Sequence, residues 1–335
     1  MVAVIVVGFN SQQYLDDCFS SVLRSNYDQY RIIFVDNNST DQSVEYVSRK
    51  YPSVVIIQND QNLGFARANN IGLANAAKIG AEYVLLLNPD TIIDEKCLFY
   101  LTSNPNPHTI LQPLVLLYKN TKTSLINSAG NHLNFLGISY CGDYKKNRSS
   151  AKSGSIVSAS GTALFAPIKL LNNIGGFDES FFMYHEDLDL CWRARMAGYQ
   201  IKLVSDAIVW HKYHYSANPI KMYYFERNRI IFLFKNYEVK TLLLIAPALF
   251  LHELLVCAYA IKGQFLTAKL KSYASVVQLL PLIMIGRKSV KRVRGDHQLK
   301  KLINAQIQFE EVTVPLIAVY NKLLRGYWKI IFPLI

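Results

Sequence analysis

The sequence has few cysteines and lacks the short motifs that mark several large enzyme classes. Its five cysteines are scattered over 335 residues and form no CxxC pair. This pattern excludes a disulfide framework and a cysteine zinc site, and it indicates reduced thiols in a cytosol-facing protein. No GxGxxG follows the first apolar run and no GxxxxGK[ST] occurs, which argues against a dinucleotide oxidoreductase and a P-loop enzyme. No basic segment precedes the apolar amino terminus, so we expect a first strand there and not a signal peptide.

What the chain does have is apolar bulk and positive charge. Hydrophobic residues make up 51% of it, which allows a sizeable core and excludes wholesale disorder. The net charge is +12, and residues 262–335 hold 13 Lys and Arg against 3 Asp and Glu. Nucleic acid, an anionic membrane surface and a phosphorylated substrate would each attract such a tail.

Short apolar runs alternate with helical patterns in the first 90 residues. The runs that we predict to be strands are Val2–Val7, Arg31–Val35, Val54–Ile57 and Tyr83–Leu87. This alternation predicts an α/β fold, a mostly parallel sheet with helices on both faces. Ligands of such sheets bind at the carboxyl ends of the strands. There the sequence places Phe9–Asn10, Asp36–Asn38 and Asn88–Asp90, so we expect these polar segments to converge on one edge.

Side chains at this edge would hold a nucleotide, since no glycine-rich phosphate loop is present. We expect Phe9 to pack near the base and Asp36 to accept a hydrogen bond from the base or the ribose. An ordinary turn rich in Asx residues is the alternative for Asp36–Asn38. Arg67 is able to reach the nucleotide, but it equally suits a solvated helix position.

A second informative stretch, Gly175–Arg195, packs acidic residues among aromatic and large apolar ones. A carboxylate beside apolar bulk is costly unless it is paired, protonated or used in chemistry. One interpretation is a helix start, where Glu186 and Asp187 complement the helix dipole and Asp189 pairs with Arg193 one turn later. The other is the wall of a polar pocket, which better explains a Gly-Gly turn and an aromatic block ahead of an acidic pair.

This stretch, GGFDESFFMYHEDLDLCWR, resembles the second signature of the family 2 glycosyltransferases, in the branch that contains rhamnosyltransferase-like enzymes. Three further blocks agree in order and spacing: VVGFNS at Val6–Ser11, DNNSTDQS at Asp36–Ser43, and NLGFARANNIG followed by LLLNPD within Asn62–Asp90. The similarity covers roughly residues 1–235. It implies a GT-A fold, with a Rossmann-like, mostly parallel central sheet flanked by helices.

The resemblance also implies roles for individual residues. Asp187 would be the general base, with Glu186 to orient it. Asn88-Pro89-Asp90 stands where many members carry Asp-x-Asp, so Asp90 would bind Mg²⁺ or Mn²⁺, joined by His211; for His211 a structural role is the alternative. The expected donor-binding residues are Phe9, Asn10, Asp36, Asn38, Gly64, Arg67, Asn88, Asp90 and Arg227, and the expected acceptor-binding residues are Gly161, Tyr184 and Trp192. Buried packing is the alternative for Tyr184 and Trp192, and the charged edge of an amphipathic helix is the alternative for Arg227. Gly161 would lie on a strand over Val157–Pro167.

We predict a catalytic domain over residues 1–237, with a nucleotide half at 1–100 and an acceptor half at 101–237, and a helical tail over 238–335. Leu242–Ile261 is about one bilayer thickness long. However, it contains Pro247 and the adjacent His252-Glu253, and polar or charged groups are expensive in lipid. We therefore expect the tail helices to lie in the interface of an anionic membrane, on its cytoplasmic face, in preference to spanning it. Ordinary core helices with a solvated basic face are the alternative.

The predicted function is inverting transfer of a sugar from a nucleoside diphosphate-sugar, with dTDP-rhamnose as the expected donor. A lipid-linked saccharide or other glycan in cell-surface polysaccharide synthesis is the expected acceptor. The alternatives are a transferase that uses UDP-hexose or UDP-GlcNAc, and a non-catalytic carbohydrate- or membrane-binding partner of another transferase. A sugar-nucleotide-forming nucleotidyltransferase is disfavoured, because the loop VGFNSQQ has no basic residue to hold a triphosphate. Nucleic acid is not expected as a partner, since the basic residues of the tail are interleaved with aliphatic ones.

Overall fold

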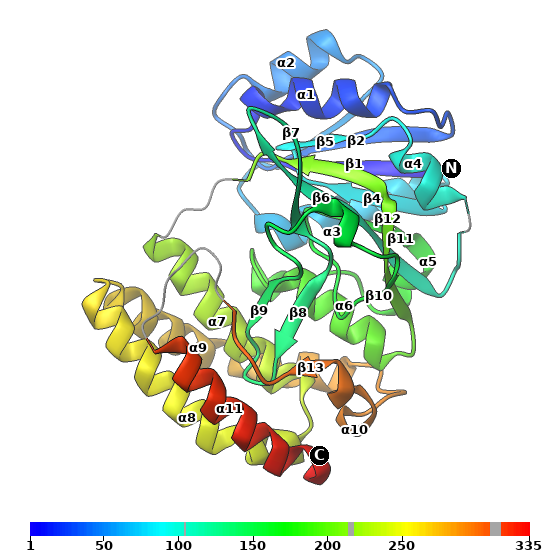
Figure 1. Cartoon of the computed structure of the whole chain (residues 1–335). Coiled ribbons are helices and arrows are strands. Elements are labelled where there is room, and N and C mark those ends of the chain that lie inside the picture. Colours follow the sequence, from blue (N-terminus) through cyan, green and yellow to red (C-terminus); the bar gives the residue numbers. More distant parts are fainter. Residues whose placement is uncertain (104, 214–217, 309–315) are drawn as a thin grey trace. The chain divides into compact units, whose positions relative to one another are not determined.

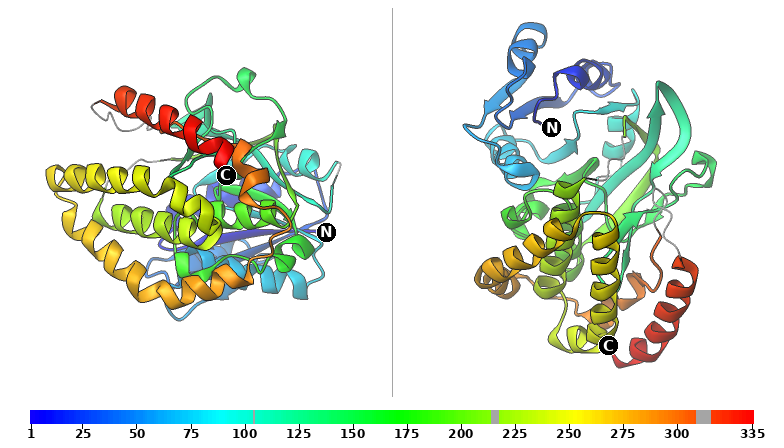
Figure 2. Two further views of the ribbon diagram at one scale, coloured as in Figure 1. Left: turned by 90° about the horizontal axis from the view of Figure 1, so that it is seen from below. Right: turned by 90° about the vertical axis from the view of Figure 1, so that its left-hand side faces the viewer.

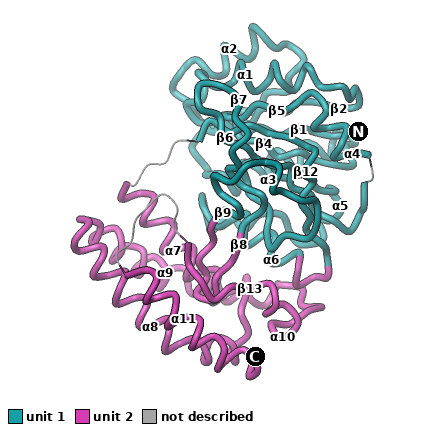
Figure 3. The backbone as a smooth tube through the Cα atoms, viewed as in Figure 1, with its two compact units in different colours: residues 1–131, 141–194, 199–214 teal, residues 132–140, 195–198, 215–335 magenta. Residues whose placement is uncertain are grey.

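The computed structural model describes residues 1–335 except 104, 214–217 and 309–315. Its described residues form two compact units (Figure 3). The first unit contains residues 1–131, 141–194 and 199–214, and the second contains residues 132–140, 195–198 and 215–335. The domain division that we predict from the sequence, at residue 237, stays a prediction.

The first unit is built on a ten-stranded sheet whose parallel half has the order β3-β2-β1-β4 (Figure 1). Its strands are β1 (Val2–Gly8), β2 (Tyr30–Asp36), β3 (Val55–Gln58) and β4 (Tyr83–Leu87), and the helices between them are α1 (Gln12–Leu23), α2 (Ser43–Lys50) and α3 (Gly64–Lys78). The α/β fold and the mostly parallel sheet that the sequence predicts are therefore confirmed.

Strand β1 is apolar on both sides because helices cover both faces of the sheet. Val4 belongs to a buried cluster with Phe19 of α1, whereas the neighbouring Ile5 belongs to a second cluster with Leu73 of α3. All four of these side chains are buried. Successive side chains of a strand point to opposite faces, so a strand buried on both faces appears in the sequence as a continuous apolar run.

The other half of the sheet mixes parallel and antiparallel pairs, in the order β4-β11-β6-β12-β10. Its strands are β5 (Thr91–Ile93), β6 (Thr109–Lys119), β7 (Thr121–Ser128), β10 (Gly154–Ser155), β11 (Ala163–Pro167) and β12 (Gln200–His211). Its helices are α4 (Cys97–Thr102), α5 (Ile168–Asn173) and α6 (Glu186–Met196), with single 3-10 turns at Arg148–Ser150 and Glu179–Phe181.

The strand that we predicted over Val157–Pro167 is shorter, since β11 begins only at Ala163. The backbone turns before it: the N–H of Ala163 donates to the carbonyl of Ser160 at 3.3 Å, and the N–H of Ser160 donates to Gln112 Oε1 at 2.7 Å. Gly161 consequently lies in a turn at the start of β11 and not within a strand.

The second unit is mainly helical, which agrees with the helical tail predicted from the sequence. Its helices are α7 (Pro219–Asn236), α8 (Val239–Lys262), α9 (Leu266–Ser289), α10 (Asp296–Leu299) and α11 (Ile317–Ile331), with 3-10 turns at Lys300–Leu302 and Phe332–Leu334. A small sheet of β13 (Ile303–Asn304), β8 (Asn131–Asn134) and β9 (Ser139–Cys141) accompanies them. Figure 2 shows the long helices α8 and α9 as adjacent members of this bundle.

Candidate active site

Three polar segments meet at the carboxyl edge of the parallel strands. Gly8 at the end of β1 pairs in register with Asp36 at the end of β2, and Val6 of β1 pairs with Leu87 at the end of β4. The segments that follow these strands are Phe9–Asn10, Asn37–Asn38 and Asn88–Asp90, so the register itself brings them to one edge of the sheet, as in other open α/β folds.

Asn10 ties the first two segments together. Its backbone, with φ of 50°, lies in the left-handed region that Asn tolerates. Its side-chain Oδ1 accepts from the N–H of Thr40 at 2.8 Å, and its own N–H donates to Ser39 Oγ at 2.9 Å. Phe9 beside it is half exposed, with 50% of its surface accessible, which leaves a ring face open at the edge where we expect the base.

Asp36 has one carboxylate oxygen that accepts a hydrogen bond and one that does not. Oδ2 accepts from the N–H of Ser39 at 3.1 Å. Oδ1 is buried and has no hydrogen-bond partner among the described residues. A buried acceptor without a donor costs free energy, so a ligand that brings an N–H or O–H to this position would gain from it. Asn38, next to the turn, has a left-handed φ of 66°.

A residue that the sequence analysis did not single out, Asn37, connects this edge to helix α3. It is buried, and its Nδ2 donates to Asn62 Oδ1 at 2.9 Å and to the carbonyl of Gly64 at 3.3 Å. Its Oδ1 accepts from the N–H of Leu63 at 3.0 Å. The DNN sequence was the available signal, because a buried Asn in such a turn must find partners for both ends of its amide.

Gly64 begins α3, while Arg67 one turn later is at the surface. Arg67 Nε lies 3.5 Å from Glu179 Oε2, and both side chains are about half exposed. This is the arrangement of the solvated-helix alternative, and it leaves Arg67 as a weak candidate for a nucleotide contact.

Asp90 and His211 lie together, as the metal hypothesis requires. Strand β5 follows Asp90 directly and pairs antiparallel with the end of β12, which sets Thr91 opposite His211. His211 Nε2 is 3.2 Å from Asp90 Oδ2. Asn88 in the same loop accepts from the Thr91 hydroxyl through its backbone carbonyl, at 2.6 Å.

Asn127 of β7 completes this arrangement, and sequence reasoning missed it because residues 100–155 carry no motif. Its Oδ1 lies 2.8 Å from His211 Nδ1, and both side chains are buried. With Nδ1–H donated to Asn127, His211 presents the lone pair of Nε2 toward the Asp90 carboxylate. Such outer partners orient metal-binding histidines.

This pair fits a divalent cation. Two acceptor atoms facing each other repel unless a cation or a proton lies between them, and neighbouring ligands of Mg²⁺, with bonds of about 2.1 Å, lie roughly 3 Å apart. Among the described residues no group of three or more His, Cys, Asp or Glu is placed to hold a metal.

Helix α6 begins with two acidic residues, Glu186 and Asp187, and we call this end of the helix the acidic helix mouth. The two carboxyl groups have different surroundings. Asp187 is only partly buried, and its Oδ2 accepts from the N–H of Gly161 at 2.8 Å. Burial raises its pKa, while the hydrogen bonds from Gly161 and Leu188 act in the opposite direction. Glu186 is buried; burial first, and then the neighbouring Asp187 carboxylate, raises the pKa of Glu186 well above its ordinary value. Of the two residues, Asp187 is the more exposed.

The segment just before this helix is conformationally unusual. Phe182, Tyr184 and His185 all have φ between 62° and 66°, a region that costs most L-residues about 1–2 kcal/mol. Contacts hold it in place: the carbonyl of Phe182 accepts from the N–H of Ala66 in α3 at 3.2 Å. Strain of this kind concentrates at functional sites.

The remaining expected residues behave differently from one another. Asp189 and Arg193 form the buried ion pair of the structural alternative, with Nε and Oδ2 2.7 Å apart. Trp192 is fully buried, so its ring has no open face for a sugar and packs in the core, whereas Tyr184 is half-buried. Arg227 belongs to the second unit and stacks against Tyr224, with its guanidinium carbon 4.8 Å from the ring centre.

A mostly parallel sheet with polar groups at its carboxyl edge is typical of α/β enzymes that bind nucleotides. The model of the glycosyl transferase family 2 matches residues 3–103, and that of the glycosyl transferase family group 2 matches residues 83–286. The chain belongs to this family, and it is a family 2 glycosyltransferase.

Relatives and solved structures agree with this placement. The poly-beta-1,6-N-acetyl-D-glucosamine synthase of Staphylococcus epidermidis is 26% identical over 211 residues, which are 62% of this chain and 49% of that protein. The chain thus spans about half the length of the curated relatives it matches.

Two solved structures share the fold. GalNAc-T7 with UDP, GalNAc and Mn²⁺ has a TM-score of 0.59 at 13% identity, covering 72% of this chain and 48% of that one. TarS residues 1–349 of S. aureus with UDP-GlcNAc has a TM-score of 0.50 at 17% identity, covering 99% and 90%. At these identities the likeness shows the fold alone.

Proposed function

We propose that this chain transfers an N-acetylhexosamine, from UDP-GlcNAc or a closely related UDP-sugar, to a growing cell-surface glycan, with inversion at the anomeric carbon. The observation that carries the proposal is Asp187. This residue is partly exposed, its carboxylate accepts from the N–H of Gly161 at 2.8 Å, and it lies at the start of α6 in the unit that also contains the strand-end edge.

The donor assignment departs from our expectation of dTDP-rhamnose. The curated relatives are poly-beta-1,6-N-acetyl-D-glucosamine synthases, which favours the UDP-GlcNAc alternative, and nothing in the comparisons supports rhamnose. Oδ1 of Asp36 is buried and has no hydrogen-bond donor among the described residues, and the N3–H of a pyrimidine base is a donor that would suit it. Since uracil and thymine both carry this N–H, the choice between them rests on the relatives.

In the proposed reaction the acceptor hydroxyl oxygen attacks the anomeric carbon while the bond from that carbon to the diphosphate breaks. Asp187 takes the hydroxyl proton as the new bond forms, which is the role of a general base on the acceptor side of the sugar. Gly161 fixes its carboxylate. Burial raises the pKa of the neighbouring Glu186 well above its ordinary value, which favours the neutral form of that carboxyl group. UDP leaves with the electron pair of the broken bond.

Asp90 and His211 are the residues that would hold Mg²⁺ or Mn²⁺. A divalent cation there would neutralise the charge that develops on the leaving diphosphate. Asn127 would keep His211 in the tautomer that offers Nε2. Phe9, Asn10, Asn38, Gly64 and Arg227 remain proposed donor contacts, and Tyr184 remains a proposed acceptor contact.

The acceptor and the location are parts of the same proposal. A glycan on a lipid carrier would be met at the cytoplasmic face of the membrane, and the basic tail suits an anionic surface there. The non-catalytic alternative lacks support from the site, because Asp36, Asp90 and Asp187 are all present.

The test is turnover of a panel of sugar nucleotides, with and without Mn²⁺, by the wild type and by Asp187→Asn. We expect slow, metal-dependent hydrolysis of UDP-GlcNAc by the wild type and a large loss in the variant. Selective turnover of dTDP-rhamnose would restore the first donor hypothesis. Binding without turnover across the whole panel, with glycan acceptors also present, would favour the non-catalytic partner.

A further inference from the structure

Along most of its length, helix α8 exposes apolar side chains and turns polar ones inward, which is the reverse of a helix in a water-soluble bundle. Between Leu243 and Ile261 every exposed residue is apolar or a tyrosine: Leu243, Ala246, Pro247, Phe250, Leu251, Leu254, Leu255, Ala258, Tyr259 and Ile261. They recur at helical spacing and so form one continuous stripe. The most exposed are Leu243, at 70%, and Phe250, at 68%.

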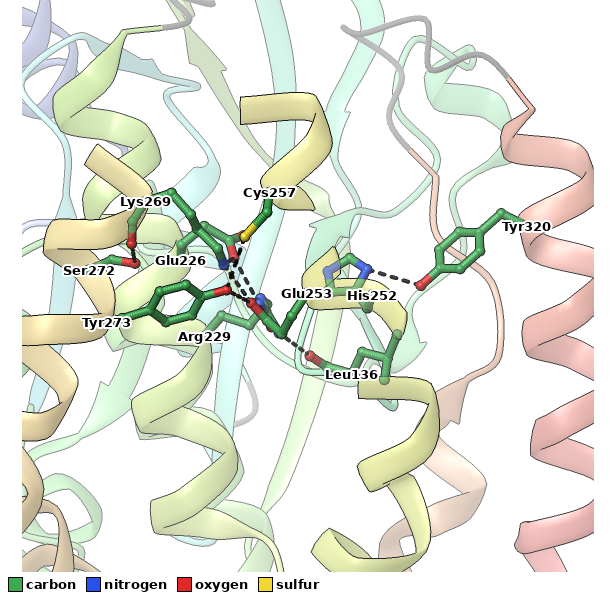
Figure 4. A network of polar contacts seen from close by, with 10 residues as sticks. All are labelled: Leu136, Glu226, Arg229, His252, Glu253, Cys257, Lys269, Ser272, Tyr273 and Tyr320. Atoms are coloured by element: carbon green, nitrogen blue, oxygen red, sulfur yellow. Dashed lines mark hydrogen bonds and ion pairs between the residues drawn. The ribbon is translucent and has the colours of Figure 1, made fainter. Parts of the chain in front are cut away.

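The polar residues of the same helix point inward, into a network that Figure 4 shows. Glu253 Oε2 accepts from Lys269 Nζ of α9 at 2.6 Å and from the hydroxyl of Tyr273 at 2.5 Å, and its other oxygen pairs with Arg229 of α7. Glu226 of α7 bonds to Arg229 at 2.8 Å and also pairs with Lys269. Two cations and two anions are thus enclosed as a neutral cluster.

His252, the other polar residue in the middle of α8, is also buried. Its Nδ1 lies 3.0 Å from the hydroxyl of Tyr320 in α11. The objection raised by the sequence, that His252 and Glu253 would face lipid at high cost, therefore does not apply, because both side chains turn away from the exposed stripe.

Helix α9 repeats the pattern over part of its length. Lys269 and Ser272 are buried, whereas Val277 is 70% exposed and Ile285 is 64% exposed. Between Ala274 and Ile285 its exposed residues are apolar apart from Gln278, while Lys271 is exposed nearer the start of the helix. In the most apolar window of each helix only 22% of α8 and 28% of α9 is buried within the chain. Core helices of a soluble bundle would be mostly buried, so the alternative of ordinary core helices is not what the structure shows.

The dimensions and charges of this surface indicate what covers it. The stripe from Leu243 to Ile261 is roughly 27 Å long at 1.5 Å per residue, close to the hydrocarbon thickness of about 30 Å. Exposed lysines stand at its two ends, Lys240 and Lys262, where they can meet anionic headgroups while the apolar residues between them meet acyl chains.

We propose that the exposed apolar faces of α8 and α9 are embedded in the hydrocarbon of an anionic bilayer. The neutral cluster, which joins Glu253 of α8 and Lys269 of α9 to Glu226 and Arg229 of α7, then lies on the side of these helices away from the lipid. This goes beyond a helical tail adsorbed by its basic residues. It holds whichever sugar nucleotide the first unit uses.

The test is flotation of the full chain with vesicles of phosphatidylcholine containing phosphatidylglycerol. Phe250→Glu should weaken vesicle binding about tenfold or more, since the burial of a phenylalanine is lost. The matched control is Phe99→Glu on α4, where a 51% exposed phenylalanine lies in the first unit; its vesicle binding should equal that of the wild type. Both residues are exposed in the chain, so both variants should fold, which thermal melts in detergent check.

Two further measurements separate the bilayer from other partners. Leu254→Trp places an indole on the stripe, and lipids brominated in the acyl chains should quench its fluorescence. Binding should also persist in about 1 M NaCl, where screening removes headgroup attraction. Equal binding by wild type and Phe250→Glu, loss of binding in high salt, or Leu254→Trp fluorescence that brominated vesicles leave unquenched would each overturn the proposal. An unquenched indole in a chain that forms dimers would identify a second copy as the partner.

Discussion

The contact between Gly64 and Phe182 links the nucleotide-side helix to the acidic helix mouth, and replacing Gly64 by alanine tests it. A Cβ at Gly64 would lie 2.5 Å from Phe182 Cδ2 and 2.7 Å from the Phe182 carbonyl oxygen, with φ at +78°. The left-handed φ costs alanine about 1–2 kcal/mol, and forcing an atom into a filled space costs about 1–3 kcal/mol more. We therefore expect Gly64→Ala to lower the free energy of unfolding by about 2–5 kcal/mol.

The chain offers a matched control in Gly80→Ala. Gly80 has nearly the same φ, +76°, but a Cβ there would meet nothing within 4 Å. Both substitutions carry the same backbone strain and the same change in unfolded-chain entropy, so their difference isolates the contact with Phe182. Urea unfolding of the two variants should differ by about 1–3 kcal/mol.

The same substitution should also affect turnover. Phe182 is the first residue of the strained segment that precedes Glu186 and Asp187. A displacement of about 1 Å at a catalytic group can lower the rate 100-fold. Gly64→Ala should therefore lose at least about tenfold in kcat, with Gly80→Ala unchanged. Equal stability and equal kcat in the two variants would refute the argument.

Three further predictions concern the buried charges and the proposed site. Asp187→Asn should lose activity and yet be more stable than the wild type at neutral pH. The pKa of Asp187 is raised in the folded state, so the wild type loses stability as the pH rises from 3.8, the ordinary pKa of this group, through the folded pKa. A wild-type kcat/KM that shows no acidic limb above pH 3.8 would contradict this. Asn127→Leu should weaken Mn²⁺ binding about 10–100-fold, as measured by titration calorimetry in the presence of UDP. The control Asn127→Asp should keep the wild-type affinity. Unchanged affinity in Asn127→Leu would show that Asn127 does not position His211 for the metal. Asp189→Asn should cost about 3–5 kcal/mol in urea unfolding, because Arg193 is left buried without its counter-charge; the control Glu179→Gln, which breaks a half-exposed pair, should stay within about 1 kcal/mol, and similar losses in both would be the wrong outcome.

Local pattern sufficed for the parallel half of the sheet. The runs Val2–Val7 and Tyr83–Leu87 appear as β1 and β4, because a strand buried on both faces needs an unbroken apolar run. Parallel strands run in the same direction, so the residues that follow each strand lie at a common edge of the sheet. Asp36 and Asp90 were therefore predictable as site candidates.

The sequence pattern left two interpretations open where the surroundings of a side chain come from distant segments. Trp192 fits a sugar platform by its position beside the acidic pair, yet it is buried, and Arg67 meets Glu179 at the surface. Neither outcome has a local signal, since both depend on which other element lies against the side chain.

The sequence alone determined the order of strands and helices, the edge where the polar segments lie, the acidic helix mouth and the apolar, basic tail. Only the tertiary structure decided that Asn127 holds His211 beside Asp90, that Asp187 is partly exposed while Glu186 is buried, and that Glu253 faces Arg229 and not the exposed apolar stripe. Hydrophobic periodicity acts between near neighbours and fixes the elements one at a time. Burial and the pairing of charges arise between residues far apart in the chain, and these exist only once the elements have packed.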